Sequence, residues 1–452
     1  MNELTIARNP SSEEGRLGEL AEAARLAFIY GFPCYEMARL RYRALTQGDG
    51  AARLNSFRHG RRLIFPGNNL TTGNNVDTLY SGVWIDLSRG PLVIHAPKIE
   101  GRYYSFQLLD FFTNNFAVLG PQTMLGGGND FLLVGPAWQG NAPDGMTLLR
   151  SPTNAVWGTL RILTDPEDLE AARALQDQFS ISPQSRAAAE PARGGAADPR
   201  SLPVLPLERA DPLTFFEILN NLLTENQPPE QDRDMLDRLR LIGVGPSLQF
   251  DRDNFTAAQQ ESLRQGIAAA RELIRAPMYS AAGGWSRPPA DMGVFGTNYA
   301  WRARCALIGI GALPREEAMY FTTFSDAGGA PLRGHNRYVM RFEAGALPPV
   351  DAFWSLTVYR RDKQKRRWLV PNAVNRYSIG NRTRHLRYGA DGSLEIFIQH
   401  ARPVAHQENW LPAPQGPFLL TLRAYRPRHE LLDGRYTIPL PAPRLRAQNN
   451  AS

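Results

Sequence analysis

Residues that can carry acid/base chemistry are concentrated in two neighbouring segments of the first third of the chain. Residues 73–81 read Gly-Asn-Asn-Val-Asp-Thr-Leu-Tyr-Ser, and residues 101–110 read Gly-Arg-Tyr-Tyr-Ser-Phe-Gln-Leu-Leu-Asp. Both segments lie in stretches that otherwise alternate as β-strands do. A polar side chain on a strand faces water or lines a site, because burial without a hydrogen-bond partner costs about 1–3 kcal/mol. These two segments therefore mark the candidate site.

The carboxyl group of Asp77 is the candidate general acid or base. A carboxylate beside Tyr80, at the mouth of an aromatic β domain, is expected to have a raised pKa and to exchange protons with a ligand. The structural alternative is that Asn and Asp before a strand close turns on backbone amides, a role that fits Gly73 and Asn74. We predict Asp77 and Tyr80 as catalytic residues and Asn75 as a substrate-binding residue.

The second segment offers a cation and two phenols. The guanidinium of Arg102 can hold a carboxylate or phosphate in a bidentate manner, and a phenol can donate to a developing oxyanion. Tyr103 and Tyr104 face opposite sides of a strand, so at most one of them points into a given pocket. We predict Tyr104 as catalytic and Arg102 and Tyr103 as substrate-binding. Asp110 is expected to be structural, pairing with Arg102 or closing a backbone turn.

A second polar and aromatic set lies in the last fifth of the chain. Its members, which we predict to bind substrate, are Asn372, Arg376, Tyr377 and Trp410. The alternative is that residues 375–377 only anchor the loop that follows Pro371. Sequence alone leaves both roles open.

Signatures of other chemistries are missing from the sequence. There is no G-x-S-x-G nucleophile elbow, no H-E-x-x-H zinc helix and no Walker loop. His400, His406 and Glu408 are the only close set of possible metal ligands, and a strand-end and a solvated histidine explain them without a metal. We predict neither a metal nor a cofactor. Cys34 and Cys305 lie beside apolar residues and are expected to be buried, inert thiols.

Composition describes an ordinary globular protein. The chain has 452 residues, of which 43% are hydrophobic and 21% are charged, enough for two or three domains with substantial cores. No apolar run approaches the ~18 residues that span a bilayer. The polar N-terminus lacks the basic and apolar regions of a secretory signal. We therefore expect a cytoplasmic protein with no membrane partner.

The net charge of +7 raises the question of a nucleic-acid partner. Much of the excess lies in residues 360–367, which read Arg-Arg-Asp-Lys-Gln-Lys-Arg-Arg between two strand-like runs. A solvated hairpin loop explains this stretch, and a phosphate-binding patch is the alternative. Because no zinc-finger, helix-turn-helix or RNA-recognition signature accompanies it, we predict no nucleic-acid partner.

Periodicity places these residues in a mainly β fold with a helical middle. Helical spacing predicts one or two helices over 17–45, interrupted at residues 31–33 because proline cannot continue the hydrogen-bond ladder. Period-two patterns predict short strands over 62–164 and again from 318 to the end, with a tight turn at Asp391-Gly392. Further helices are predicted at 211–224, 230–241, 254–275 and 299–312.

The predicted architecture is two antiparallel β-sandwich or jelly-roll-like domains joined by helices. The predicted units are an N-terminal helical segment (1–60), an N-terminal β domain (61–165), a helical linker region (166–317) with a flexible part at 183–205, and a C-terminal β-sandwich domain (318–452).

Two ordered sets of motifs resemble a known pair of families. The N-terminal set comprises residues 75–81, 84–87, 101–104, Asp110 and 114–116, and the C-terminal set comprises 353–359, 370–372, 375–380, 391–394, 398–400, 409–414 and 416–418. They resemble the paired domains of unknown function numbered 1254 and 1214, over most of residues 20–440. The resemblance implies a two-part β architecture joined by helices, often assembled into an oligomer, and it implies no particular reaction. Arg360 and the basic loop depart from the family, which usually has an acidic residue and a short turn there.

Two functions fit these observations. The first is a cofactor-independent acid/base enzyme that acts on a moderately apolar small molecule, as a hydrolase, lyase, isomerase or cyclase. The second is a non-catalytic ligand-binding, carbohydrate-binding or assembly protein, because β-sandwiches often present Trp, Tyr, Asn and Asp to sugars. We favour the enzyme, because the polar cluster mixes acid, hydroxyl and cationic groups. A small-molecule ligand and a homo-oligomer are the expected partners.

Overall fold

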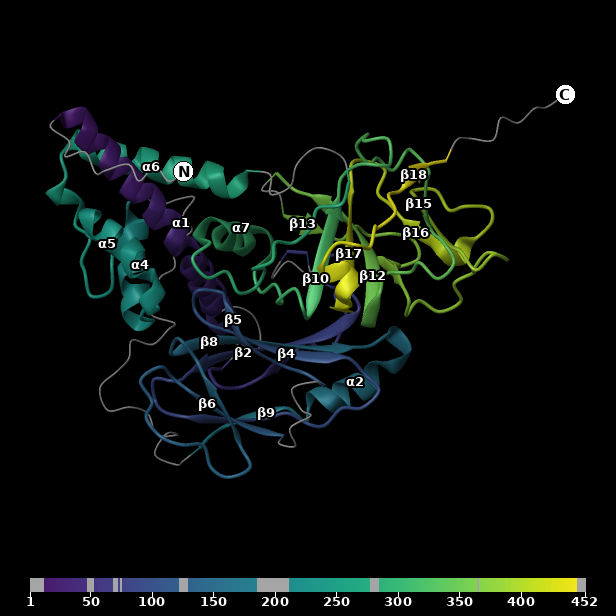
Figure 1. Ribbon diagram of the computed structural model, residues 1–452, viewed down its shortest axis with the longest axis horizontal. Helices are drawn as coiled ribbons and strands as arrows, with labels where there is room; N and C mark the ends of the chain where they lie inside the picture. Colours follow the sequence, from purple (N-terminus) through teal and green to yellow (C-terminus); the bar gives the residue numbers. More distant parts are fainter. Residues whose placement is uncertain are drawn as a thin grey trace.

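Two β regions joined by a helical region make up the chain (Figure 1). The computed structural model describes residues 12–46, 53–67, 72–73, 75–121, 129–184, 211–276, 284–363 and 366–444. The predicted mainly β fold with a helical middle is confirmed. Asn74 and the predicted flexible linker from residue 185 onward lie outside the described residues.

The N-terminal β region consists of two sheets. The first has the strand order β1 (Arg58–His59), β2 (Thr78–Asp86), β8 (Ala155–Leu163), β4 (Tyr104–Leu109) and β5 (Asn115–Leu119). The second has the order β7 (Thr147–Arg150), β6 (Asp130–Val134), β3 (Leu92–His95) and β9 (Ser180–Pro183). The β6–β7 pair is parallel, whereas the other pairs are antiparallel. Because β9 pairs with β3, this region extends past the predicted boundary at 165, and it includes η2 (Pro166–Asp168) and α2 (Leu169–Gln176).

Alternation along β2 explains how these sheets pack and which residues they present to the rest of the chain. Leu79, Val83 and Ile85 face a core shared with the second sheet. The residues between them, Tyr80 among them, therefore point the other way. That other face of the β2–β8–β4 sheet is turned toward the C-terminal β region, which lies above it in Figure 1.

The C-terminal β region is also built from two sheets. One has the order β10 (Ala318–Thr323), β17 (Leu419–Pro427), β12 (Val350–Arg361) and β13 (Arg367–Trp368), with β14 (Ser378–Gly380) beside β12. The other has the order β16 (Trp410–Pro412), β15 (Leu394–Gln399), β11 (Tyr338–Phe342) and β18 (Ala442–Pro443). The short helices η6 (Gln407–Asn409) and α8 (His429–Leu432) complete it. The β15–β16 pair is parallel, and apolar side chains fill the space between the sheets.

Two predicted turns of this region are confirmed. The basic stretch closes a hairpin, because Arg360 pairs with Trp368 across β12 and β13; residues 364–365 lie outside the described residues. Arg367 turns inward and donates to the carbonyl oxygen of Ile308 (3.2 Å), so the stretch is not wholly solvated. At the second turn Gly392 has a positive φ of 79°, which glycine adopts without steric cost.

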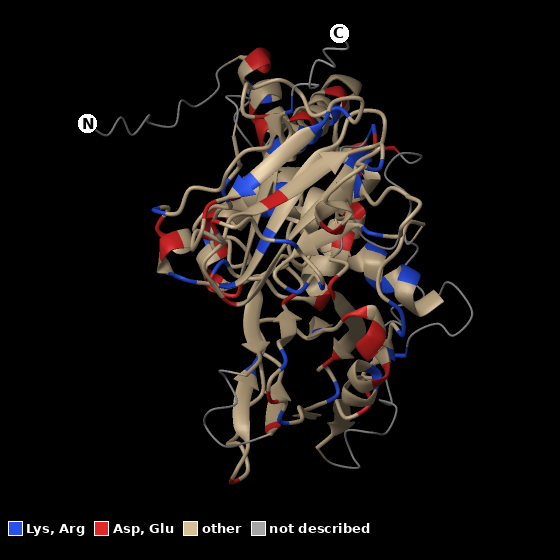
Figure 2. Ribbon diagram, turned by 90° about the vertical axis from the view of Figure 1, so that its right-hand side faces the viewer, with Lys and Arg blue, Asp and Glu red and all other residues tan. Residues whose placement is uncertain are grey.

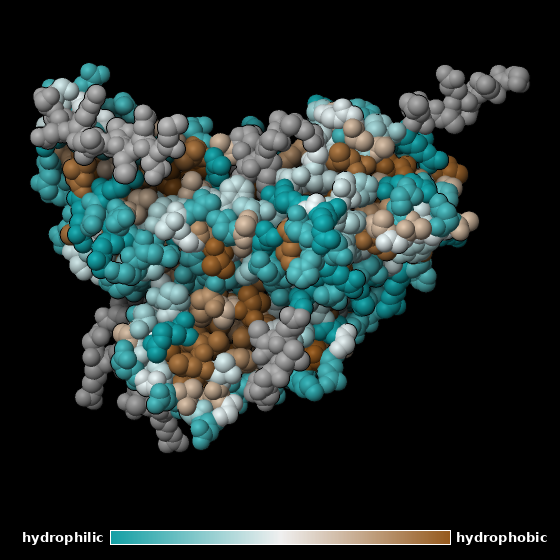
Figure 3. Space-filling view, in the orientation of Figure 1, coloured by the Kyte–Doolittle hydropathy of each residue, from teal (hydrophilic) through white to brown (hydrophobic). Residues whose placement is uncertain are grey.

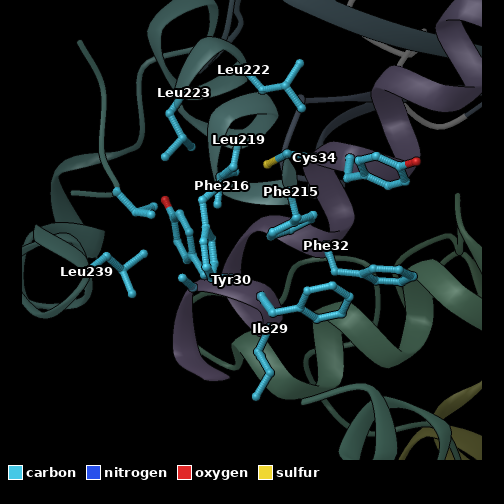
Figure 4. Close-up of a cluster of buried hydrophobic side chains, with 14 of the residues drawn as sticks. Ile29, Tyr30, Phe32, Cys34, Phe215, Phe216, Leu219, Leu222, Leu223 and Leu239 are labelled. Atoms are coloured by element: carbon cyan, nitrogen blue, oxygen red, sulfur yellow. The ribbon is translucent and has the colours of Figure 1, made fainter. Parts of the chain in front are cut away.

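Helices that precede and follow the N-terminal β region in the sequence form the third part of the fold. They are α1 (Glu13–Thr46), α4 (Thr214–Glu225), α5 (Arg233–Leu239), α6 (Ala257–Arg275) and α7 (Tyr299–Gly309), with single 3-10 turns η3 (Glu230–Asp232), η4 (Arg240–Ile242) and η5 (Arg252–Asn254). Figure 4 shows side chains of α1, such as Tyr30 and Phe32, together with Phe215 and Phe216 of α4.

The predicted interruption of the first helix is wrong. Helix α1 continues through Pro33, which lies inside it. Proline removes one backbone hydrogen bond and strains the preceding turn. The residues around Pro33 are buried on nearly every side, including Phe28, Ile29 and Phe32, and packing of this kind routinely overrides local propensity.

Close packing of α1 and α6 depends on a glycine. A Cβ atom at position 266 would lie 2.1 Å from the carbonyl oxygen of Ala21. Gly266→Ala must therefore push the two helices apart, and we expect the free energy of unfolding to fall by ~1–3 kcal/mol. Urea denaturation measures this loss. Gly18→Ala, on the exposed side of α1 where a Cβ meets nothing within 4 Å, is the matched control and is expected to raise the stability by up to ~1 kcal/mol. Equal effects of the two substitutions would contradict this packing.

Candidate functional site

The candidate site lies where the β2–β8–β4 sheet faces the β10–β17–β12 sheet. Three hydrogen bonds connect the two sides: Asn75 Nδ2 donates to the hydroxyl of Tyr425 (2.9 Å), Ser378 Oγ donates to Asp77 Oδ1 (2.9 Å), and the Tyr103 hydroxyl donates to Glu317 Oε1 (2.6 Å). Segments that are hundreds of residues apart in the sequence thus meet at Asn75 and Asp77.

Asp77 has the properties of a proton-exchanging carboxyl group. Its Oδ1 accepts the hydrogen bond from Ser378, and its Oδ2 is buried. Burial raises the pKa of Asp77, and the nearby hydroxyls of Ser355 and Ser378 and the charge of Arg423 lower it in part. The net shift is upward, as expected for a desolvated carboxylate.

Asn75 holds the hydroxyl groups of two tyrosines, Tyr80 and Tyr425. Its backbone amide donates to the hydroxyl oxygen of Tyr80 (3.2 Å), and its side-chain amide donates to that of Tyr425. Its own Oδ1 accepts from the backbone amide of Asp77 (2.9 Å). Since both phenol oxygens act as acceptors toward Asn75, each keeps its O–H proton for another partner.

Two buried arginines lie on the facing sheets. Arg161 of β8, which is 7% exposed, donates to Gln107 Oε1 (2.7 Å) and to the carbonyl oxygen of Gly311 (3.1 Å). Its guanidinium carbon lies 5.4 Å from the centroid of the Tyr80 ring. Arg423 of β17 is 2% exposed and donates to Thr357 Oγ1 (2.9 Å), the Tyr359 hydroxyl (2.7 Å) and the carbonyl oxygen of Gly73 (2.6 Å).

Buried hydroxyl groups without a partner line the same interface. Among the described residues, these groups are Thr78 Oγ1 on β2 and Thr159 Oγ1 on β8. Buried polar atoms in folded proteins nearly always have a partner. The interface between the two sheets therefore offers hydrogen-bonding groups that the protein itself does not saturate.

Two of the residues predicted for this site lie elsewhere. Tyr104 is fully buried in the core of the N-terminal β region, with its ring 5.9 Å from that of Phe179. Arg102 donates to the carbonyl oxygen of Leu163 (2.7 Å) and pairs with Asp168. Tyr103, by contrast, reaches the interface.

Asp110 takes the structural role predicted for it. Its Oδ1 accepts from the backbone amides of Phe112 and Asn114, each at 2.9 Å. Asp110 therefore closes a backbone turn, which is one of the two roles predicted from the sequence. It does not pair with Arg102, whose partner is Asp168.

The buried hydroxyl of Tyr104 gives a stability prediction. It has no hydrogen-bond partner among the described residues, and burial raises the pKa of Tyr104 to about 12. Because an unsatisfied buried hydroxyl is destabilising, Tyr104→Phe is expected to raise the free energy of unfolding by ~1 kcal/mol. Urea denaturation measures it. A loss of stability would show that the hydroxyl has a partner.

The predicted C-terminal set forms mainly internal contacts. Asn372 Oδ1 accepts from the backbone amide of Arg376 (3.2 Å), and Arg376 Nη1 donates to the carbonyl oxygen of Trp410 (3.0 Å). The Trp410 ring nitrogen donates to the carbonyl oxygen of Gln399 (2.9 Å). These bonds fit the loop-anchoring alternative. Tyr377 packs beside Tyr359 at the edge of the site.

Possible metal ligands do not gather in the described part of the chain, where no group of three or more His, Cys, Asp or Glu could hold an ion. His400 Nδ1 lies 3.0 Å from the carbonyl oxygen of Ala413, His406 stacks on Phe397, and Glu408 pairs with Arg387. As for the thiols, burial raises the pKa of Cys34 and of Cys305 to about 12. None of the described helices is long and apolar enough to cross a lipid bilayer.

Arg161, Arg423 and the residues that the C-terminal β region contributes to the site were not predicted from the sequence. Arg161 and Arg423 each interrupt an apolar strand run, Thr-Leu-Arg-Ile-Leu and Thr-Leu-Arg-Ala-Tyr. A charged residue within such a run was the available signal, since a buried arginine needs several acceptors. Tyr320, Ser378 and Tyr425 carried no comparable signal.

Comparison with known families matches each β region separately. Residues 54–183 match the family described as "Protein of unknown function (DUF1254)", and residues 317–429 match "Protein of unknown function (DUF1214)". The family resemblance is confirmed. The DUF1254 region supplies Asn75, Asp77, Tyr80 and Arg161, and the DUF1214 region supplies Tyr320, Ser378, Arg423 and Tyr425.

One solved structure has a similar fold over nearly the whole chain. The crystal structure of the VPA0106 protein from Vibrio parahaemolyticus is similar at 26% sequence identity, covering 94% of this chain and 100% of that one, with a TM-score of 0.69. A putative uncharacterized protein from Burkholderia cenocepacia is 15% identical, covers 96% of this chain and 90% of its own, and has a TM-score of 0.44. Comparison with curated proteins gave no match.

Proposed function

We propose that the protein is an enzyme that performs acid/base chemistry on a moderately apolar small molecule bound between the DUF1254 and DUF1214 regions. The observation that carries this proposal is the carboxyl group of Asp77, which is buried at the interface of the two regions and has a raised pKa. A positioned carboxyl group with a raised pKa is suited to exchange a proton with a bound molecule.

The groups around Asp77 support a division of roles. Asp77 takes a proton from the substrate or gives one to it. Tyr80 and Tyr425, whose oxygens are held by Asn75, donate their O–H protons to negative charge that develops on the substrate. Hydrolysis, elimination, isomerisation and cyclisation all need these two functions, so the reaction type stays open among them.

Aromatic residues beside the polar groups support a partly apolar substrate. Phe353 stacks on Tyr425 with ring centroids 4.3 Å apart, and Tyr103 meets both rings edge-on at 5.6 and 5.2 Å. Such a cluster offers an apolar surface next to the hydrogen-bonding groups. Asn372, Arg376, Trp410, Arg102 and Tyr104 are not included in the proposed site.

The alternative is a protein that binds a small molecule, such as a carbohydrate, without transforming it. The unpartnered hydroxyls of the interface favour this alternative as much as the enzyme, because they require only a polar ligand. The raised pKa of Asp77 favours the enzyme.

An untargeted search for substrates distinguishes the two functions. The purified protein is incubated with a small-molecule extract of its expression host, and mass spectrometry follows which compounds are consumed and formed. We expect the wild-type protein and Tyr104→Phe to produce the same change and Asp77→Asn to produce none. A compound that is retained by the protein but never converted would favour the binding protein. A change that persists in Asp77→Asn would rule out the proposed role of Asp77.

Location and assembly stay predictions from the sequence. This proposal includes a cytoplasmic location and assembly into a homo-oligomer. It also includes a function that needs no cofactor, metal or nucleic acid. Basic and acidic residues are interspersed over the side seen in Figure 2, which supports a protein without a nucleic-acid surface there. Figure 3 shows hydrophobic residues gathered on the lower part of one face, in the N-terminal β region, which supports self-association.

A further inference from the structure

We propose that the ligand of this site carries an oxyanion, a carboxylate or a phosphate-type group, that is bound by Arg161, Arg423 and the hydroxyl groups of Tyr80 and Tyr425. This inference takes the position of the ligand from the proposed function. It does not require that the protein converts the ligand.

Each facing sheet supplies one arginine and one tyrosine in directly opposite register. Arg161 of β8 pairs with Tyr80 of β2, and Arg423 of β17 pairs with Tyr320 of β10. Directly opposite residues in an antiparallel pair have their side chains on the same face of the sheet, about 5 Å apart at Cβ. Tyr425 lies two residues after Arg423 and so shares its face. The two sheets thus direct two guanidinium groups and three phenols toward one interface.

Three tyrosines interact electrostatically with both arginines. Tyr320 and Tyr425 each feel the charges of both Arg161 and Arg423. Tyr80 likewise interacts with both guanidinium groups. A ligand atom that contacts these phenols therefore lies within reach of both positive charges.

The two buried arginines have no carboxylate in direct contact among the described residues. Within the described residues, neither Arg161 nor Arg423 forms an ion pair; their acceptors are carbonyl, amide and hydroxyl oxygens. Asp77 interacts with Arg423, and Glu317 with Arg161, at longer range than an ion pair. A buried charge is costly unless it is paired, so an anionic group is the ligand that this environment favours.

The hydrogen-bonding groups also select an anion. Tyr80 and Tyr425 each accept one hydrogen bond from Asn75, and their O–H groups remain to donate to a ligand. Guanidinium groups are donors as well, and they match the planar or tetrahedral oxygens of carboxylate and phosphate. The two positive charges disfavour a cation as the ligand.

Matched pairs of small probes test this inference. Isothermal titration calorimetry compares benzoate with benzamide, and phenyl phosphate with phenol, on the full-length wild-type protein. We expect the anion of at least one pair to bind at least 10-fold more tightly than its neutral partner. The pair that shows the preference distinguishes a carboxylate site from a phosphate site. Equal binding within both pairs, or no binding of either anion, would overturn the inference.

Substitutions then assign the binding to this site. Tyr425→Phe keeps the stacked ring and removes one donor, and we expect the affinity for the preferred anion to fall about 10-fold or more. Arg161→Lys keeps the positive charge but removes the planar guanidinium group, and we expect a similar fall in affinity. Arg428→Gln, which changes an exposed arginine paired with Asp351, is the control and is expected to leave the affinity unchanged. Unchanged affinity in both site variants would overturn the inference.

The two proposals can fail separately. Anion binding that disappears in Tyr425→Phe while Asp77→Asn still converts the substrate would keep the anion site and exclude the catalytic role of Asp77. Conversion that depends on Asp77, with no preference for anionic over neutral probes, would keep the enzyme and exclude the anion site.

Discussion

Asp77→Asn is expected to lower kcat by about 10²–10⁴-fold, the contribution that a positioned general acid or base usually makes. Asparagine has the same shape as aspartate, and its Oδ1 can still accept the hydrogen bond that Ser378 donates. What the substitution removes is the ability to exchange a proton. Substrate binding is therefore expected to change much less than turnover, and steady-state kinetics on the substrate found in the host extract measures both.

A shift in the pH profile separates this role from a structural one. The hydroxyls of Ser355 and Ser378 lower the pKa of Asp77, so Ser378→Ala raises that pKa further. The limb of the pH–rate profile that reports Asp77 is then expected to move to higher pH in Ser378→Ala. An unmoved limb, or an Asp77→Asn variant with undiminished kcat and an intact fold, would show that another group performs the proton transfer.

Stability is expected to fall as the pH rises from about 4 to about 6, because of Asp110. Burial raises the pKa of Asp110 from 3.8 to about 6. The folded protein therefore favours the protonated carboxyl group, so this contribution to stability is complete below pH 3.8 and is lost as the pH rises through 6. The difference in pKa corresponds to about 3 kcal/mol. Asp110→Asn is expected to flatten this part of the pH dependence and to raise the stability at pH 7.

Urea denaturation at several pH values measures the effect of Asp110. Asp391 is the matched control, because the hydroxyl and amide of Ser393 and the charge of Arg341 lower its pKa. Its contribution to stability has the opposite sign: it is present above the ordinary pKa and is lost as the pH falls. Asp391→Asn is thus expected to lower the stability at pH 7. A pH dependence that is the same in Asp110→Asn and in the wild-type protein would contradict the assignment.

Local patterns predicted most of the strands but could not predict how the sheets meet. Alternation placed Tyr103 and Tyr104 on opposite faces, as observed. It did not indicate which face packs on the second sheet of the same region and which meets the other region. That choice depends on contacts such as Tyr103 with Glu317, which join residues 214 positions apart. The role predicted for Tyr104 therefore fell on the wrong side of the strand for a site at Asp77.

About half of the candidate site could be predicted from the sequence. Asn75, Asp77 and Tyr80 lie in one short segment whose composition is unusual for a strand and its preceding turn. Arg423 and Tyr425 reach the same place only through tertiary structure, because β17 contacts the segment just before β2 when the two regions join. The continuity of α1 through Pro33 has a similar cause, since burial of the helix outweighs the local effect of proline.

The most direct test of the account is a crystal structure of the Asp77→Asn variant with the unconverted substrate bound. We expect electron density between the β2–β8–β4 and β10–β17–β12 sheets, with one substrate atom in hydrogen-bonding distance of position 77 and an oxygen atom near the hydroxyl groups of Tyr80 and Tyr425. Density for the substrate anywhere else, such as at the basic hairpin of β12 and β13, would contradict it.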